Sequence, residues 1–460
     1  MATARSVNVV GRTAADIACM VRAGEILPRD VVGQYLEQIE SLDRQVGAFQ
    51  VVRVEKAAAE ADEVAKRADL STLPLAGVPV PIKDNLPVAG EPMRDGSLAT
   101  SHRPSAEDHE VVRRLRAAGA VVIGITRLPE LGIFGATDGA FGITRNPWNL
   151  ERTPGGSSGG AAAAVASAMA PAAQGNDGLG SIRIPCACCG LFGIKPGRGV
   201  VPSDVGPTSW FGLAENGPIA TTVDDAALVL SVMAGCLDLA SPQPPERPLR
   251  IAVSTKPPLA GIRVDRPYRQ AVEDTAQLLE QAGHRVTKAD PPDSLQVGTW
   301  VLAWWFAAVA AEVEGMGLDV RRLEPRTRRH AAIGRLVRRF KLMKTEQRDR
   351  WRERVAPFFA AHDVLVTPAL ARTPIRALQW GRKGWLANVY ANANYAPFAA
   401  PWNFAAYPAA AIPAGMHPDG LPLSVQLVAS EGNEATVLAV AKQIEGLCAW
   451  RRHAPLAGLD

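Results

Sequence analysis

Two serines set among glycines are the residues of this chain best suited to chemistry. Ser157 lies in PGGSSGG (154–160), and Ser181 closes the run GLGS (178–181). Glycine permits positive φ and a close approach of the backbone, so such serines are expected on tight, exposed turns. Residues 161–173 between them are nearly all small and apolar, which predicts a tightly packed, buried helix. The two turns should then lie at opposite ends of one short element and could fold back on a common site.

A lysine in an apolar setting supplies a third chemical group. The segment PLAGVPVPIKDN (74–85) is an extended apolar run broken by prolines, and it carries Lys83 near its end. Burial of an ammonium group is costly unless the group is paired or loses its proton. One interpretation is a structural lysine paired with Asp84. The other joins Lys83 to the two serines as the parts of a hydrolase that needs no histidine.

Several short motifs occur in one order along the chain. Three of them are IKDN, PGGSSGG and GSIRIP, and RNPWN (145–149), CGLFGIKP (189–196) and DGLPLSVQLV (419–428) accompany them. Together they cover most of the chain, and the sequence resembles the amidase signature family. The resemblance implies an α/β fold with a mixed central sheet covered on both faces by helices. It also implies hydrolysis of a carboxamide.

The resemblance assigns a role to each of the three groups. It implies that Ser181 is the nucleophile, that Ser157 follows a cis peptide and relays the proton, and that Lys83 receives it. Lys83 must then be neutral, which requires its pKa to fall by roughly three units from about 10.4, or about 4 kcal/mol. Ser158, Asp177 and Arg183 are expected to brace the nucleophile loop, with direct substrate contact as the alternative for Arg183.

The loop before the nucleophile departs from the family pattern. The family implies an oxyanion hole built from the backbone N–H groups of Gly178, Leu179, Gly180 and Ser181. A leucine at position 179 would cost about 1 to 2 kcal/mol if the site requires positive φ. Its side chain would also enter space that a glycine leaves empty. The sequence therefore predicts a narrowed or reshaped acyl site, with weak activity as an alternative consequence.

The substrate is only coarsely indicated. Hydrolysis would proceed through an acyl-enzyme on Ser181, and esters or hydrazides could also react. An aromatic or bulky apolar acyl group is expected if the candidate contacts line the site: Trp210, Trp304, Trp305, Trp385 and Asn394. One alternative is the glutamine-hydrolysing subunit of a transamidosome, which often has Gln where this chain has Ile184. Another is a binding or scaffold protein that has lost activity through the change at Leu179.

Composition sets further limits. The chain has 460 residues, 47% hydrophobic and 21% charged, with a net charge of +4, which is typical of a globular protein. The N-terminal stretch lacks the apolar core of a signal peptide, so we expect a cytoplasmic protein. The CACC run (186–189) lacks metal-ligand spacing, and no metal or cofactor is expected. The expected partner is a small-molecule amide; a homodimer is compatible with the sequence, and neither nucleic acid nor firm membrane association is expected.

The motifs indicate one amidase domain over 1–460. Helical patterns over 13–25, 28–43 and 51–68 predict an N-terminal helical part (1–70). Strands alternating with helices predict a core over 71–240, and a proline-rich linker (244–254) leads to a variable substrate or cover region (255–390). Residues 391–460 are expected to return to the core.

The segment 321–354 is strongly basic. It holds fourteen lysines and arginines against four acids. Its apolar residues keep helical spacing and predict one packed stripe: Ile333, Leu336, Val337, Phe340 and Met343. We favour a solvated basic face, with contact to an anionic membrane or acidic partner, and then nucleic acid, as alternatives.

Overall fold

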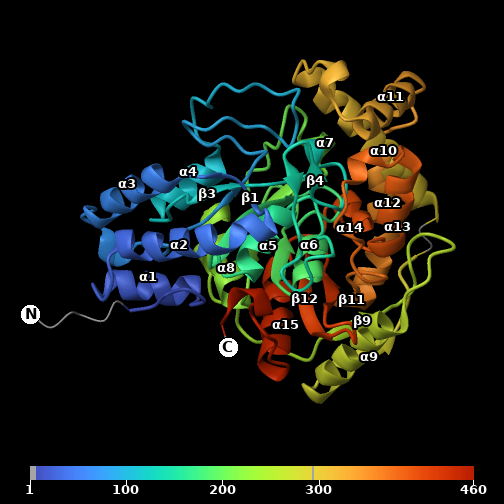
Figure 1. The fold of residues 1–460 in the computed structure, drawn as a ribbon. Coiled ribbons are helices and arrows are strands. Elements are labelled where there is room, and N and C mark those ends of the chain that lie inside the picture. Colours follow the sequence, from blue (N-terminus) through green and yellow to red (C-terminus); the bar gives the residue numbers. More distant parts are fainter. Residues whose placement is uncertain (1–6, 293–294, 460) are drawn as a thin grey trace, which may run out of the picture.

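A mixed sheet forms the centre of the computed structural model, which describes residues 7–292 and 295–459 (Figure 1). Part of the stretch considered for a signal peptide therefore lies outside the described residues. Within them, eight strands lie in the order β10-β9-β11-β13-β12-β7-β8-β6. β9 is parallel to β10 and β11, and all other neighbours are antiparallel. In sheet order the bounds are Arg285–Lys288, Arg250–Val253, Val364–Pro368, Pro422–Val428, Ala409–Met416, Phe192–Lys195, Glu215–Ala220 and Ala172–Asp177.

Helices cover both faces of this sheet, so the predicted fold class is confirmed. α8 and α9 both pack against α15, and α5 packs against α6. The strands β11 and β13 are buried along their whole length, as expected for apolar runs covered on both sides. The bounds of these helices are Gly159–Ala166 (α5), Arg183–Cys189 (α6), Val223–Ala234 (α8), Arg266–Gln281 (α9) and Glu434–Leu447 (α15).

A smaller N-terminal layer positions Lys83. A three-stranded sheet has the order β1-β3-β2, and Lys83 is the last residue of β2. The helix expected over 51–68 was partly wrong, because Phe49–Val52 forms β1, where the branched side chains of VV suit pairing with β3. The elements are α1 (Ala14–Arg22), α2 (Pro28–Val46), α3 (Val54–Ala65), β2 (Ile82–Lys83), α4 (Glu110–Ala117), β3 (Gly124–Thr126), β4 (Asp138–Gly139) and β5 (Gly142–Ile143).

The small-residue run between the two serines is a buried helix only as far as Ala166, so that prediction was partly wrong. α5 ends at Ala166, Ala168 turns with a φ of 54°, and Pro171 cannot continue a helix. The chain then enters β6, which ends at Asp177. Ser157 therefore precedes α5 and Ser181 follows β6. The two serine turns are joined by a helix and a strand that run back beside each other.

The region from α10 to α14 lies on the opposite side of the sheet from the N-terminal helices (Figure 1). By length and composition, Gln296–Gly315 could cross a membrane, but 67% of its most apolar window is buried inside the protein, as in a core helix. The bounds here are Ser209–Gly212 (α7), Leu295–Gly315 (α10), Pro325–Arg339 (α11), Glu346–Ala361 (α12), Trp385–Tyr395 (α13) and Ala400–Ala405 (α14).

The basic segment forms two helices, α11 and α12, joined by a turn at Lys341, whose φ is 52°. The predicted stripe was wrong for two of its residues. Leu336 and Phe340 are 54% and 66% exposed, whereas Val337 is buried and Met343 packs against the core. α11 instead buries a row of mostly smaller or polar residues: Arg326, Thr327, His330, Ala331, Gly334 and Val337.

Candidate active site

Lys83 and Ser157 meet in the interior. The Lys83 Nζ lies 2.7 Å from the Ser157 Oγ and 2.7 Å from the Asn176 Oδ1, and it reaches the Asn176 carbonyl at 3.4 Å. Both side chains are buried, with Ser157 2% exposed. The bond between Gly156 and Ser157 is a cis peptide. The ion pair with Asp84 considered from the sequence is not formed. The Asp84 carboxylate instead accepts from the backbone N–H of Arg94.

Burial sets the charge of Lys83. The backbone N–H of Lys83 donates to the Gln174 side chain, which fixes the end of β2 against β6. Burial of the ammonium group lowers the pKa of Lys83 from 10.5 to about 7, while the negative charges of Asp95 and Asp177 act in the opposite direction. A large share of Lys83 is therefore neutral near pH 7. A neutral amine can accept a proton, which an ammonium group cannot.

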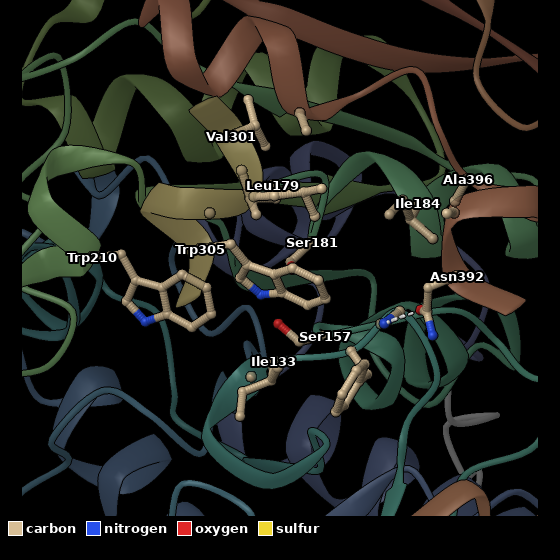
Figure 2. Close-up of a pocket in the computed structure, with 18 of the residues that line it drawn as sticks. Ile133, Ser157, Leu179, Ser181, Ile184, Trp210, Val301, Trp305, Asn392 and Ala396 are labelled. Atoms are coloured by element: carbon tan, nitrogen blue, oxygen red, sulfur yellow. Dashed lines mark hydrogen bonds between the residues drawn. The ribbon is translucent and has the colours of Figure 1, made fainter. Parts of the chain in front are cut away.

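Ser181 lies between β6 and α6, two residues before the helix begins. Gly180 has a φ of 119°, in the region that favours glycine, and this turns the chain so that Ser181 remains partly exposed. The Ser158 N–H donates to the Ser181 carbonyl, and the Ser158 Oγ contacts the backbone of Asn176. Ser158 thus ties the two serine turns to β6. Ser157 and Ser181 both line one cavity (Figure 2).

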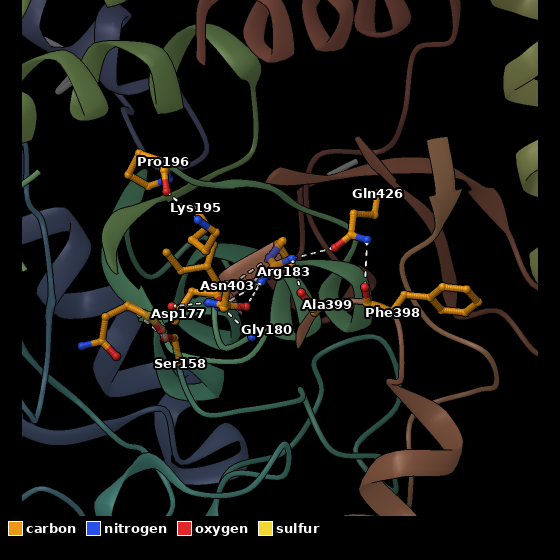
Figure 3. Close-up of polar contacts among 12 residues, drawn as sticks. Ser158, Asp177, Gly180, Arg183, Lys195, Pro196, Phe398, Ala399, Asn403 and Gln426 are labelled. Carbon is orange, nitrogen blue, oxygen red and sulfur yellow. Dashed lines mark hydrogen bonds and ion pairs between the residues drawn. The ribbon is translucent and has the colours of Figure 1, made fainter. Parts of the chain in front are cut away.

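A buried ion pair holds the nucleophile loop (Figure 3). The Asp177 carboxylate accepts from the Arg183 guanidinium at 2.9 and 3.0 Å and from the backbone N–H groups of Gly180 and Ile182. Burial opposes ionisation of Asp177, but the Arg183 charge and the hydrogen bonds from Arg183 and Asn403 outweigh it and hold the pKa of Asp177 well below its usual range. Arg183 also donates to Gln426 and to the Ala399 carbonyl. Arg183 is not among the residues that line the cavity, so its geometry fits a brace.

The predicted oxyanion loop changes in one respect. The Gly180 N–H donates to Asp177 at 2.5 Å, so it is not free to receive an oxyanion in this structure. Within the described part of the chain, the N–H groups of Leu179 and Ser181 have no hydrogen-bond acceptor. Leu179 does not adopt positive φ, so the backbone strain considered for it does not arise. Gly180 adopts the positive φ instead, which a glycine does without strain.

The cavity beside the two serines is apolar. Its volume is about 160 Å³, and among the described residues that line it none is Asp, Glu, Lys, Arg or His. Trp210, Trp305 and Leu179 form part of its wall (Figure 2). The Leu179 side chain is half-buried and contacts the apolar clusters on both sides of it. Leucine at this position therefore occupies cavity space, as the sequence predicts.

The other predicted contacts lie elsewhere. Trp304 is buried and donates to Gln347, and Trp385 donates to His330. Asn394 donates to the Tyr390 carbonyl, and it is the nearby Asn392 that lines the cavity, where its Oδ1 accepts from the Gly135 N–H. Residues two apart on a helix point to roughly opposite sides, and the sequence alone does not show which side faces the cavity.

Sequence reasoning missed four amides that hold the site. Asn176 contacts Lys83, and Asn85 pairs with Asn176 through both side chains. Asn403 and Gln426 hold Arg183 (Figure 3). Asn85 lies in IKDN and Gln426 in DGLPLSVQLV, so those motifs carried a signal, whereas nothing in the sequence around Asn403 marks it.

The cysteines of CACC are free thiols. Cys186, Cys188 and Cys189 are buried in α6, and burial raises the pKa of all three. Among residues 7–292 and 295–459, no three His, Cys, Asp or Glu side chains come together as possible metal ligands. These cysteines therefore act as small packing residues in the core.

Comparisons with known proteins give matches over most of the chain. A family model described as Amidase matches residues 30–438. The putative amidase AmiB2 of Mycobacterium tuberculosis is 41% identical over 454 residues, which cover 96% of this chain and 97% of that protein. An acylamidase of Rhodococcus erythropolis is 31% identical, with 98% of each chain covered. The crystal structure of a bacterial aryl acylamidase of the amidase signature family has a TM-score of 0.84 at 26% identity and covers 98% of this chain and 99% of that one.

The mixed sheet and these matches define an enzyme class, the amide hydrolases. The chain belongs to the amidase signature family. It is an amidohydrolase, an enzyme that cleaves amide C–N bonds.

Proposed function

We propose that the protein hydrolyses uncharged carboxamides with an apolar acyl group through an acyl-enzyme on Ser181. One observation carries the proposal. Lys83, buried and shifted toward its neutral form, lies 2.7 Å from Ser157, and Ser157 and Ser181 line the same uncharged cavity. This is the arrangement of a nucleophile, a relay and a base.

The orientation of Lys83 suits a base. A neutral amine has two N–H donors and one lone pair. The side-chain and main-chain oxygens of Asn176 can accept both N–H groups. The lone pair then faces the Ser157 hydroxyl. Asn176 thereby supports the proposal that Lys83 accepts a proton from Ser157 and not from solvent.

The proposed reaction has two halves. The Ser181 Oγ adds to the amide carbon while its proton passes to Ser157, whose own proton passes to Lys83. The relay then returns a proton to the leaving nitrogen, the C–N bond breaks, and ammonia or an amine departs. Water adds to the acyl-enzyme by the same relay, and cleavage of the C–O bond releases the acid and restores Ser181.

We assign the oxyanion hole to the N–H groups of Leu179 and Ser181. Both are free of internal acceptors within the described residues, whereas Gly180 donates to Asp177. Such donors act best where water is excluded and the dielectric is low. Loss of one oxyanion donor typically costs about 10² to 10³ in kcat. Gly178 lies in the same loop, beside the Trp210 ring.

The cavity supports a neutral, apolar substrate class. A charged substrate group would lose its hydration without gaining a partner, because no described lining side chain carries a charge. Trp210 and Trp305 offer large apolar faces for an aryl or bulky aliphatic group. The relatives named acylamidase and aryl acylamidase support such a substrate. Glutamine, with its ammonium and carboxylate groups, is disfavoured, and so is the transamidosome alternative.

A fluorophosphonate probe tests the nucleophile. We expect labelling at Ser181 that disappears in Ser181→Ala and falls strongly in Lys83→Ala and Ser157→Ala. Ser167→Ala is a matched control, because Ser167 is buried, lies outside the cavity, and has an Oγ with no hydrogen-bond partner among the described residues. An inert Ser181 would favour the scaffold alternative.

A paired substrate screen tests the substrate class. Aryl and alkyl primary amides and anilides are compared with charged amides of similar size, glutamine included, with acid release as the readout. We expect turnover of the neutral members only. Equal or better turnover of glutamine would contradict the proposed substrate class while leaving the role of Ser181 intact.

A further inference from the structure

The turn between α11 and α12 exposes apolar side chains that folding does not use. Leu336, Phe340 and Leu342 are 54%, 66% and 54% exposed. Leu336 and Phe340 are four residues apart and so lie on one face of the end of α11, and Leu342 follows in the turn. α11 packs along α10 by its other side, through residues such as Ala331 and Gly334. We call residues 335–344 the α11 tip.

The same tip is cationic throughout. It contains Arg335, Arg338, Arg339, Lys341 and Lys344, and no acidic residue occurs from 325 to 345. Arg338 pairs with Glu314. For the other four side chains, no ion pair or hydrogen bond is formed with any described residue. Unpaired cations beside exposed apolar groups offer a surface complementary to an anionic, apolar partner.

The tip also stands where a flat partner can reach it. Figure 1 shows α11 at the outer edge of the molecule, beyond α10 and away from the central sheet. The eight apolar and cationic side chains named above are all exposed, whereas Val337 is buried and Met343 is half-buried. A flat surface can thus contact the tip without rearrangement of the fold.

We propose that the α11 tip docks the enzyme on anionic phospholipid bilayers. Leu336, Phe340 and Leu342 enter the interface between headgroups and acyl chains, and the cations contact lipid phosphates. A bilayer uses both features at once, whereas a nucleic acid backbone would use the cations and leave three large apolar side chains in water. This inference departs from the prediction that the protein has no firm membrane association.

Docking would place the active-site region close to the membrane. α10 packs along α11 and contributes Val301, Leu302 and Trp305 to the cavity wall. Apolar amides partition into bilayers, so docking would raise their concentration near the enzyme. The docking itself does not depend on the proposed substrate, because it rests on the tip alone.

Vesicle cosedimentation tests the proposal. Full-length protein is mixed with vesicles of phosphatidylcholine alone or of equal parts phosphatidylcholine and phosphatidylglycerol. We expect binding to the anionic vesicles only, weakened at about 1 M salt, where the Debye length is about 3 Å. Replacing Leu336, Phe340 and Leu342 by Ser should weaken binding about tenfold or more. Replacing Arg335, Arg339 and Lys341 by Gln should weaken it about 100-fold.

A matched control removes equal charge elsewhere. Arg103, Arg285 and Lys288 are exposed, lie outside α11, and have no side-chain partner among the described residues. Their replacement by Gln should leave vesicle binding unchanged. Amide hydrolysis without vesicles should be unchanged in all three variants, which shows that they are folded. Absence of binding to anionic vesicles, equal loss in the control variant, or binding only to nucleic acid would overturn the proposal.

Discussion

Replacing Lys83 by Met should make the protein more stable at neutral pH while abolishing catalysis. Methionine fills a similar volume and carries no charge. In the folded protein, burial lowers the pKa of Lys83 from 10.5 to about 7. The unfolded chain therefore binds a proton that the folded chain releases between about pH 7 and 10.5. Wild-type stability must rise with pH in that window, because the unfolded state holds more protons there.

The structure sets the magnitude. At 1.36 kcal/mol per pKa unit, the lowered pKa of Lys83 costs about 5 kcal/mol of unfolding free energy at low pH. About 4 kcal/mol of this cost disappears between pH 7 and pH 10.5. Lys83→Met removes this cost but also removes the hydrogen bonds to Ser157 and Asn176, at roughly 1 kcal/mol each. We expect the variant to be more stable than wild type by about 2 kcal/mol at pH 7 and less stable by about 2 kcal/mol near pH 10.5.

Urea unfolding followed by tryptophan fluorescence at the two pH values measures this difference. The other titrating groups are the same in wild type and variant. The change with pH in the difference between their free energies of unfolding therefore reports on Lys83 alone. Lys83→Arg is a matched variant that stays charged at both pH values and should be destabilised at both. A stability difference that is the same at pH 7 and pH 10.5 would refute the reasoning, because Lys83 would then keep its ordinary pKa in the folded protein.

Three further predictions concern the site. First, kcat/KM should be constant above about pH 7 and fall about tenfold per pH unit below it, because only neutral Lys83 accepts a proton; a flat pH–rate profile from pH 5 to 8 would exclude this base. Second, Leu179→Gly should enlarge the cavity and raise kcat/KM for bulky aryl amides relative to small aliphatic ones by about tenfold, measured on a matched amide series; an unchanged ratio would show that Leu179 does not contact the acyl group. Third, Arg183→Ala should lower the free energy of unfolding by about 3 to 5 kcal/mol, since it leaves the Asp177 carboxylate buried without its partner; in urea unfolding, a loss below about 1 kcal/mol would contradict the bracing role.

The predicted fold class was recoverable from the sequence because local patterns reflect it directly. Short apolar runs such as VLVTP in β11 and PLSVQLV in β13 are typical of buried strands, and both segments form strands buried along their whole length. Predictions failed where a local pattern fits two structures. The small residues of 161–173 favour a helix, but the helix ends at Ala166, and the turn at Ala168 and Pro171 leads into β6. The spacing of Leu336 and Phe340 suits a packed stripe, but among the described residues no neighbouring element covers that face.

The sequence by itself determined which groups are present: two glycine-set serines, a lysine in an apolar segment, and the motifs around them. These features depend on residue type and short spacing, which are read directly from the sequence. Only the tertiary structure decided their partners. Ser157 lies 74 residues from Lys83 and Gln426 lies 243 residues from Arg183, yet each pair is in hydrogen-bond contact. The charge of Lys83, the neutrality of the cavity and the exposure of the α11 tip follow from burial, and burial is settled only when distant segments pack together.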